Sequence, residues 1–333
     1  MQPMTVYGRL AEQLGAGESK VVSRIFETLL DDAEATLVLA ASPPATIEEL
    51  SQKTGIDTGR LETMIDGLFR KGLLFKSRKA DATRYYRVRN VLQLHDATAV
   101  MENPPAAMLE LWLEYTRTEW EAQSKLLGAA LPQAVMRVVP INVSVEPNAQ
   151  VLASDDVGKL IDGARTIAVT RCSCRVIDGA CGKPLEVCIQ LDRAADYAIE
   201  RGTGRKLSHA EARRMLEMCE LEGLVHVAEN KQGVGHVICN CCRDCCINWP
   251  NVETGVGKFV SPSRFRAVIH ADECNGCELC VERCFFGAMS MVDDNSLVAV
   301  DEEKCMGCGV CRPVCVVDAI SMQVIRAQEF VPA

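Results

Sequence analysis

The stretch from Cys274 to Cys315 decides the fold of the C-terminal part of this 333-residue chain. It reads Cys274-Asn-Gly-Cys277-Glu-Leu-Cys280-Val-Glu-Arg-Cys284 and later Cys305-Met-Gly-Cys308-Gly-Val-Cys311-Arg-Pro-Val-Cys315, two copies of C-x2-C-x2-C-x3-C that lie 31 residues apart. Three thiolates on one tight loop can hold three corners of a cubane, and Gly276 and Gly307 let the backbone approach the sulfur atoms. The fourth ligand must then come from beyond the loop, and we expect it on a short helix that follows.

This spacing resembles that of the bacterial 2[4Fe-4S] ferredoxins over roughly residues 264–325, in which the fourth cysteine of each copy ligates the cluster of the other copy. The resemblance implies two [4Fe-4S] clusters. Site A would take Cys274, Cys277, Cys280 and Cys315, and site B would take Cys284, Cys305, Cys308 and Cys311. Zinc is the alternative, but zinc sites use pairs of C-x2-4-C rather than triplets with a distal fourth cysteine. Phe285 and Val316 replace the proline that usually follows the distal cysteine, a departure that concerns the cluster potentials.

Strand-like segments flank these cysteines. They cover residues 266–270, 288–292 and 297–300. Together with the short helices they predict a β-α-β module repeated about a pseudo-twofold axis. We assign residues 263–333 to this domain.

The composition excludes several classes of protein. Eighteen cysteines in so long a chain are atypical of a secreted disulfide scaffold, which is usually short. A net charge of −9 and an aromatic content of 5% argue against a protein that coats nucleic acid. The N-terminus lacks a signal-peptide pattern, and no run approaches the about 18 apolar residues of a membrane span. We therefore expect a soluble, reduced protein in the cytoplasm of an anaerobe.

The N-terminal residues predict a helical domain with one hairpin. The apolar pattern indicates one or two buried helices over 20–41, a helix over 47–54, a helix over about 58–71 and a hairpin over 73–88. Thr46 and Glu49 form a capping box at the start of the second of these segments. The order resembles winged-helix domains such as those of bacterial repressors over roughly residues 25–90. We assign residues 1–95 to a winged-helix-like domain.

The charges of this domain leave two interpretations open. Residues 70–89 hold eight basic residues against Asp81, a net charge of +7 that suits phosphate contacts. They are Arg70, Lys71, Lys76, Arg78, Lys79, Arg84, Arg87 and Arg89. The helix expected to enter a DNA groove, however, carries Asp57, Glu62 and Asp66. Winged helices also dock partners or form homodimers, and we favour this interpretation over DNA binding.

A helical connector over 96–135 leads into a cysteine-rich α/β middle domain over 136–262. Its first cysteine group, Cys172, Cys174, Cys181 and Cys188, follows a predicted strand over 167–170 and supplies four thiolates within 17 residues. That is enough for a third [4Fe-4S] cluster. A four-cysteine zinc site and redox-active thiols are the alternatives. Cys219, alone in a predicted helix, is assigned to packing.

The second cysteine group contains Cys239, Cys241, Cys242, Cys245 and Cys246. On a helical turn, Cys241 would share a face with Cys245, and Cys242 with Cys246. The group would either bind a fourth cluster of its own or bridge to the first group. Arg171, Arg175 and Arg243 flank the two groups, where they would either raise a cluster potential or simply be solvated.

The whole chain therefore predicts an α+β protein with winged-helix, cysteine-rich and ferredoxin-like parts, and it resembles a family of multi-cluster iron–sulfur proteins from anaerobic bacteria. That resemblance implies electron transfer, and we interpret the chain as a component that relays low-potential electrons to or from a partner oxidoreductase or electron carrier. Residues 264–333 carry eleven acidic and six basic residues, which suits a basic partner surface.

Two other functions stay open. A redox- or oxygen-responsive regulator would place the winged helix on DNA. A reductase would keep one iron of a middle cluster open to a substrate. The sequence contains no Ser/His/Asp array, dinucleotide fingerprint or phosphate loop, so it indicates no flavin, nicotinamide or nucleotide site. We favour an electron-transfer component of an oxidoreductase system over a stand-alone enzyme, and the question of an enzymatic activity stays open.

Overall fold

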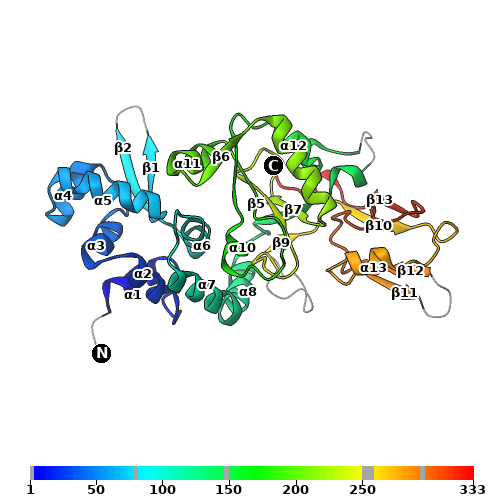
Figure 1. Cartoon of the computed structure of the whole chain (residues 1–333), viewed down its shortest axis with the longest axis horizontal. Coiled ribbons are helices and arrows are strands. Elements are labelled where there is room, and N and C mark those ends of the chain that lie inside the picture. Colours follow the sequence, from blue (N-terminus) through cyan, green and yellow to red (C-terminus); the bar gives the residue numbers. More distant parts are fainter. Residues whose placement is uncertain (1–3, 79–81, 146–149, 250–258, 293–296) are drawn as a thin grey trace. The chain divides into compact units, whose positions relative to one another are not determined.

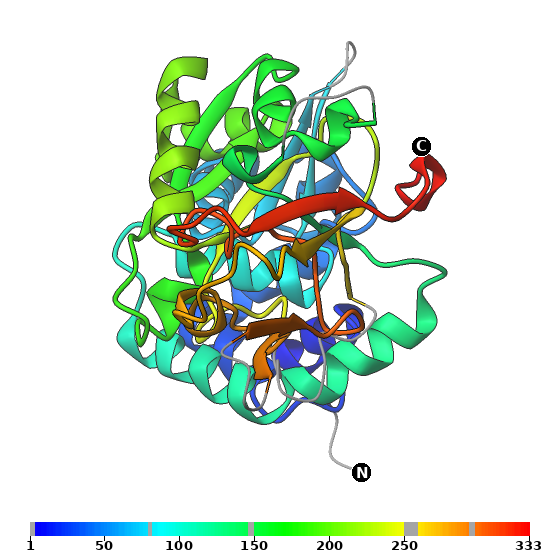
Figure 2. The same cartoon turned by 90° about the vertical axis from the view of Figure 1, so that its right-hand side faces the viewer.

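The computed structural model describes residues 4–78, 82–145, 150–249, 259–292 and 297–333. It shows a mixed α+β protein whose chain divides into two compact units (Figure 1, Figure 2). The first unit contains residues 1–120, 173–179 and 201–203, and the second contains residues 121–172, 180–200 and 204–333. Among the described residues, no helix is long and apolar enough to cross a membrane.

The first unit is helical apart from one hairpin. Its elements are α1 (Val6–Gln13), α2 (Val22–Leu29), α3 (Asp32–Ala40), α4 (Ile47–Thr54), α5 (Thr58–Lys71), β1 (Leu74–Arg78), β2 (Thr83–Arg87), α6 (Val91–Ala99), α7 (Ala106–Thr118) and α10 (Ser173–Ile177). The apolar segment over 20–41 thus forms two helices, α2 and α3. The fully buried side chains of Leu37, Leu50 and Leu61 form part of the core between the helices.

Local chemistry explains the limits of α4 and α5. The Thr46 hydroxyl accepts a hydrogen bond from the Glu49 backbone, and the Glu49 carboxylate accepts one from the Thr46 backbone, so the predicted capping box is confirmed. Gly72 ends α5 with a φ of +82°, and a Cβ there would lie 2.7 Å from the Cβ of Ala97. Glycine is therefore required at this turn.

A seven-stranded sheet forms the centre of the second unit, in the order β6-β4-β5-β8-β7-β3-β9. The strands are β3 (Met136–Val139), β4 (Ile167–Arg171), β5 (Glu186–Leu191), β6 (Gly204–Leu207), β7 (Val225–Glu229), β8 (Val237–Cys241) and β9 (Val260–Ser261). All neighbours are antiparallel except β3 and β9. The helices of this part of the chain are α8 (Trp120–Ala130), α9 (Val157–Asp162), α11 (Arg193–Arg201) and α12 (His209–Leu221).

The two faces of this sheet differ in chemistry. Along β5, buried Val187, Ile189 and Leu191 alternate with half-buried Cys188 and Gln190. The apolar side chains Ile189 and Leu191 belong to one core cluster with residues of α9 and α12. One face therefore supplies the hydrophobic core and leaves the other face to the cysteine side chains.

The C-terminal segment adds two antiparallel strand pairs to the second unit. Strand β10 (Phe265–Ile269) pairs with β13 (Ile320–Val324), and β11 (Met289–Val292) pairs with β12 (Leu297–Val300). Figure 2 shows β10 and β13 running side by side. The first strand thus pairs with the last, which brings the two cysteine motifs together.

Only one of the two expected short helices forms. Helix α13 (Leu279–Arg283) leads to Cys284 in the first motif, as predicted. In the second motif, residues 310–317 form turns and a bend instead of a helix. Pro313 explains the difference, because it lacks an N–H and disfavours the helical conformation of Arg312 before it.

Hydrogen bonds join the C-terminal segment to the sheet within the second unit. The backbone N–H of Ile141 donates to the carbonyl of Cys308 at 3.0 Å, and the Ser144 hydroxyl donates to the carbonyl of Gly309 at 2.6 Å. Arg283 donates to the carbonyls of Glu220 and Leu221 at the end of α12. A cation is favoured there by the helix dipole.

Asp155 lies buried beside two arginines at the same junction. Its carboxylate is 2.5 Å from Nη1 of Arg264, and the two side chains are only 1% and 5% exposed. Arg137 is also buried and donates to the carbonyl of Ser154 at 2.6 Å. Burial lowers the pKa of Arg137 to about 10, and the charge of Asp155 opposes that shift. Asp155 therefore compensates positive charge that would otherwise be buried alone.

Substitution Asp155→Asn should lower the free energy of unfolding of the intact protein by about 3–5 kcal/mol, because it leaves buried guanidinium charge uncompensated. Anaerobic guanidinium denaturation followed by circular dichroism measures this change. The matched control is Glu302→Gln, which breaks the ion pair between Arg266 and a 65%-exposed carboxylate and should cost less than about 1 kcal/mol. Equal losses in the two variants would contradict the assigned role of Asp155.

Candidate metal centres

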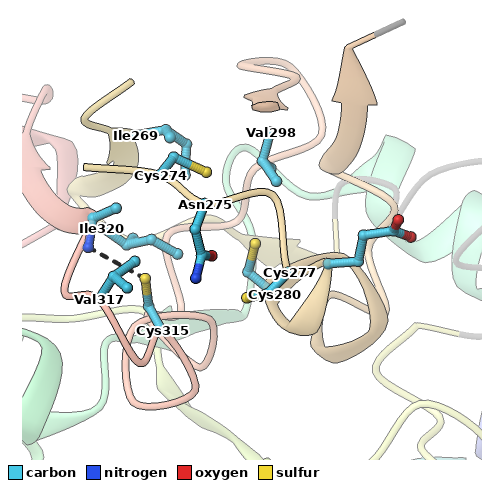
Figure 3. Close-up of a pocket in the computed structure, with 11 residues that line it drawn as sticks. Ile269, Cys274, Asn275, Cys277, Cys280, Val298, Cys315, Val317 and Ile320 are labelled. Atoms are coloured by element: carbon cyan, nitrogen blue, oxygen red, sulfur yellow. Dashed lines mark hydrogen bonds between the residues drawn. The ribbon is translucent and has the colours of Figure 1, made fainter. Parts of the chain in front are cut away.

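The four cysteines of site A surround one pocket in the C-terminal segment. Cys274, Cys277, Cys280 and Cys315 line it together with Val298 and Ile320. Figure 3 shows the three thiols of the first motif and the thiol of Cys315, from the second motif, around a common space. The Cys315 sulfur accepts a hydrogen bond from the Ala319 backbone at 3.2 Å.

The four cysteines of site B form a second group in the same segment. Burial, together with the nearby thiols of Cys284 and Cys305, raises the pKa of Cys308 to about 12. Burial and these same neighbours also raise the pKa of Cys311. Each distal cysteine thus lies with the triplet of the other motif, which is the crossed arrangement that the resemblance to bacterial ferredoxins implies.

The donor chemistry of both sites fits four-iron clusters. Each site gathers four thiols, the ligands that such clusters take from proteins. In an apolar environment a thiol stays protonated and neutral, as the raised pKa values of Cys280, Cys284 and Cys308 indicate. A bound cluster displaces those protons and supplies the positive charge that the buried thiolates need.

The two sites differ in their exposure to solvent. Cys277 of site A is exposed, and Cys274 and Cys315 are half-buried. In site B, Cys305, Cys308 and Cys311 are all buried. Solvent exposure is one of the factors that set the potential of a cluster, so the two sites are not equivalent.

Strand register gathers cysteines from both middle groups on one face of the sheet. Ile189 of β5 lies opposite Ile238 of β8, so the next pair along is Cys188 and Cys239. Cys241, two residues further, faces the same side. The Cys239 thiol hydrogen-bonds with those of Cys188 and Cys241 and lies near Cys246, and hydrogen bonding to Cys188 is the main reason why its pKa is raised. We call Cys188, Cys239, Cys241 and Cys246 the strand group.

Side-chain amides donate to two sulfurs of the strand group. Nε2 of Gln190 lies 3.1 Å from the sulfur of Cys188, and Nδ2 of Asn248 lies 3.4 Å from that of Cys241. Such hydrogen bonds stabilise thiolate sulfur and tune the potential of a cluster. The sequence analysis did not identify either residue. Strand alternation could have identified Gln190, because it lies two residues after Cys188 and therefore faces the same side of the sheet.

A second set of middle cysteines, the turn group, contains Cys181, Cys242 and Cys245. Their sulfur atoms all lie within 4.8 Å of one another. Burial raises the pKa of Cys245 to about 12. Residues 243–245 form a turn rather than a helix, so Cys242 meets Cys245 and not Cys246.

The middle cysteines are therefore grouped differently from the order in the sequence. Cys181 and Cys188, expected at one locus, lie in the turn group and the strand group respectively. The reason is that Cys188 is part of β5, whereas Cys181 precedes that strand and meets the turn after β8. Of the two arrangements left open for the second group, the structure has the one that bridges to the first.

The remaining expected residues have varied environments. Cys172 follows β4, and its backbone donates to the carbonyl of Leu185 at 2.8 Å, whereas Cys174 lies on α10 in the first unit. Arg175 is buried rather than solvated, and Arg243 is exposed. Cys219 is fully buried in α12, as expected for a packing residue.

A buried polar network lies on the opposite face of the cysteine strand. The amide of Asn240 donates to the carbonyl of Val187 at 2.6 Å, and its oxygen lies 2.6 Å from Nδ1 of His226. Nε2 of His226 lies 3.2 Å from Glu220, which accepts a further bond from the Asn142 backbone. The network ties β8 to β5 and β7 and so holds Cys239 and Cys241 in place.

In the comparisons with known proteins, the C-terminal segment matches one family model. Residues 267–290 and 298–321 match the family model of the 4Fe-4S binding domain, and these two stretches contain all eight cysteines of sites A and B. Comparisons with curated proteins and with solved structures gave no match. The match supports iron–sulfur cluster binding and, in general terms, an electron-transfer role.

Site A should lose iron before site B when the intact protein is treated briefly with ferricyanide, because Cys277 is exposed and the site B triplet is buried. Electron paramagnetic resonance should show a three-iron signal while one four-iron signal of the C-terminal segment persists. A Cys277→Ser variant identifies the sensitive cluster, since it should lack the early signal. Earlier loss of the site B cluster would contradict the difference in exposure.

Proposed function

We propose that this protein relays low-potential electrons through a series of iron–sulfur clusters to or from a partner oxidoreductase or electron carrier. Sites A and B would hold two [4Fe-4S] clusters, as the matched domain supports. The strand group would hold a third, because it offers four thiols and two amide donors. Such a chain accepts and releases electrons without binding a substrate.

The observation that carries this proposal is an aromatic contact between the middle cysteines and site B. The indole N–H of Trp249 donates to the carbonyl of Cys242 at 2.8 Å. The Trp249 ring centroid lies 5.5 Å from that of Phe285 and 5.4 Å from that of Phe286. These phenylalanines directly follow Cys284 of site B. Trp249 is buried, so packed side chains rather than solvent link the two cysteine regions.

The surface near site A is suited to a charged protein partner. Exposed Leu279 lies in the first motif, and exposed Val316 and Val317 directly follow Cys315 of the second. Four exposed acidic residues accompany them in the sequence, namely Asp272, Glu273, Glu278 and Glu282. Exposed apolar and acidic side chains near the cysteines of site A favour docking of a basic partner surface there. Asp293 and Asp294, which also contribute to the acidic count, lie outside the described residues.

The N-terminal segment is proposed as a winged-helix-like docking or dimerisation domain. Its order of helices and hairpin, with an additional bridge between Ala45 and Tyr85, supports that assignment. Many basic side chains of the hairpin region are engaged within the unit. Arg70 pairs with Asp66, Lys71 with Glu34 and Arg84 with Glu49, while Lys76 and Arg89 lie over the rings of Phe69 and Tyr86.

This pairing favours docking over DNA binding, because paired cations are less available to phosphates. Lys79 and Asp81 lie outside the described residues. The division into segments 1–95, 96–135, 136–262 and 263–333 and the cytoplasmic, anaerobic setting remain predictions.

Substitution Cys188→Ser tests the third cluster. The wild-type protein, purified without oxygen, should carry about twelve irons per chain, and the variant should carry about eight, because one four-iron unit loses a ligand. Paramagnetic resonance should show the signals of sites A and B unchanged, and electron passage to an acceptor should slow. The matched control, Cys219→Ser, removes a cysteine outside both groups and should keep all twelve. A wild-type content of eight irons would exclude the third cluster.

Duplex DNA should not bind specifically to the full-length chain in any redox state. Fluorescence anisotropy over a range of salt concentrations measures this, since phosphate contacts give a steep salt dependence. Operator-selective binding, weakened by Arg78→Ala and Lys79→Ala but not by Arg70→Ala, would support a regulator instead. Arg70 is the matched control because it is already paired with Asp66.

A further inference from the structure

The thiols of the turn group lie closer together than those of the other candidate centres. The sulfur atoms of Cys181, Cys242 and Cys245 are all within 4.8 Å of one another. No other three cysteine, histidine, aspartate or glutamate residues in the described parts of the chain are that close, although all eight cysteines of sites A and B are described. The turn group therefore differs in size from the sites that match the 4Fe-4S domain.

This separation suits one metal ion better than a cubane. Around a single tetrahedral ion with metal–sulfur bonds of about 2.3 Å, the sulfur atoms stand about 3.8 Å apart. A four-iron cluster binds each thiolate through a different iron atom, so its ligands are spread around four metals. Only a small adjustment of the three side chains would place them around one ion.

We propose that Cys181, Cys242 and Cys245 hold a single zinc ion, separate from the iron–sulfur clusters. Three thiolates and a fourth donor are a common tetrahedral zinc environment. Zinc binds such ligands more tightly than ferrous iron does. It also neutralises thiolates that burial would otherwise disfavour, since Cys242 and Cys245 are 6% and 7% exposed.

The position of the site in the sheet explains what the ion does. Strands β5 and β8 share only two registered residue pairs, Ile189 with Ile238 and Gln190 with Val237. Because the strands are antiparallel, the start of β5 lies at the end of β8. Cys181 precedes β5, and Cys242 directly follows β8. The ion therefore clamps the two strands beside Cys188 and Cys239 and keeps these strand-group thiols together.

Metal analysis and zinc X-ray absorption of the intact protein test this site. Wild-type protein from zinc-supplemented anaerobic culture should carry one zinc per chain, with at least three sulfur neighbours at about 2.3 Å. The double variant Cys181→Ser/Cys245→Ser should lose the zinc and keep its iron. Cys188→Ser should show the opposite result, loss of iron with zinc retained, and Cys219→Ser should keep both metals.

Absence of zinc from the wild-type protein, or zinc retained in the double variant, would overturn the proposal. So would the loss of four irons from the double variant, which would make the turn group part of a cluster. The zinc site does not rest on the proposed relay, because iron content and zinc content are measured separately. If the double variant fails to fold, the wild-type absorption spectrum decides, and a nitrogen- or oxygen-only shell around zinc would contradict the site.

Discussion

The pairing of Ile189 with Ile238 is the constraint on which the middle cysteine region depends. It places Cys188 beside Cys239 and turns both away from the hydrophobic core. A slip of one residue would exchange the two faces, burying the thiols among aliphatic side chains and exposing the isoleucines. The amide of Asn240, bonded to Val187 and His226, works against such a slip, because a shifted register would leave these buried polar groups unsatisfied.

Burial has opposite consequences for the apoprotein and for the protein with its metals. Without metal, burial raises the pKa values of Cys308 and Cys311 and keeps these thiols neutral. A bound cluster would replace their protons and compensate the negative charge of the thiolates. Binding of the clusters would therefore favour the folded protein. The contacts of Arg283 with the end of α12 and of Arg264 with Asp155 join the C-terminal segment to the rest of the second unit.

One residue departs from the usual ferredoxin motif, and the structure shows what its side chain contacts. Phe285 stands where proline is usual, and its ring packs against Trp249 beside the middle cysteines. Proline at this position would shorten the side chain and remove that contact. The aromatic ring of Phe285 thus joins the residues beside site B to those beside the middle cysteines through packed side chains. In the N-terminal unit, by contrast, Lys71 and Arg84 form ion pairs with carboxylates of the same unit.

The sequence by itself determined the two C-terminal cysteine motifs, the capping box at Thr46 and several strands, including β4 and β10, because these depend on spacing and on neighbours within a few residues. The crossed grouping of the cysteines was implied by the resemblance to bacterial ferredoxins. We did not predict from the sequence that the second short helix is replaced by turns, although Pro313 is the physical reason for it. Only the tertiary structure decided how the middle cysteines divide, because Cys181 and Cys188 are near in sequence but meet partners on another strand and its following turn. Strand pairing between distant segments is set by the packing of the whole sheet, so the local spacing of cysteines does not predict it.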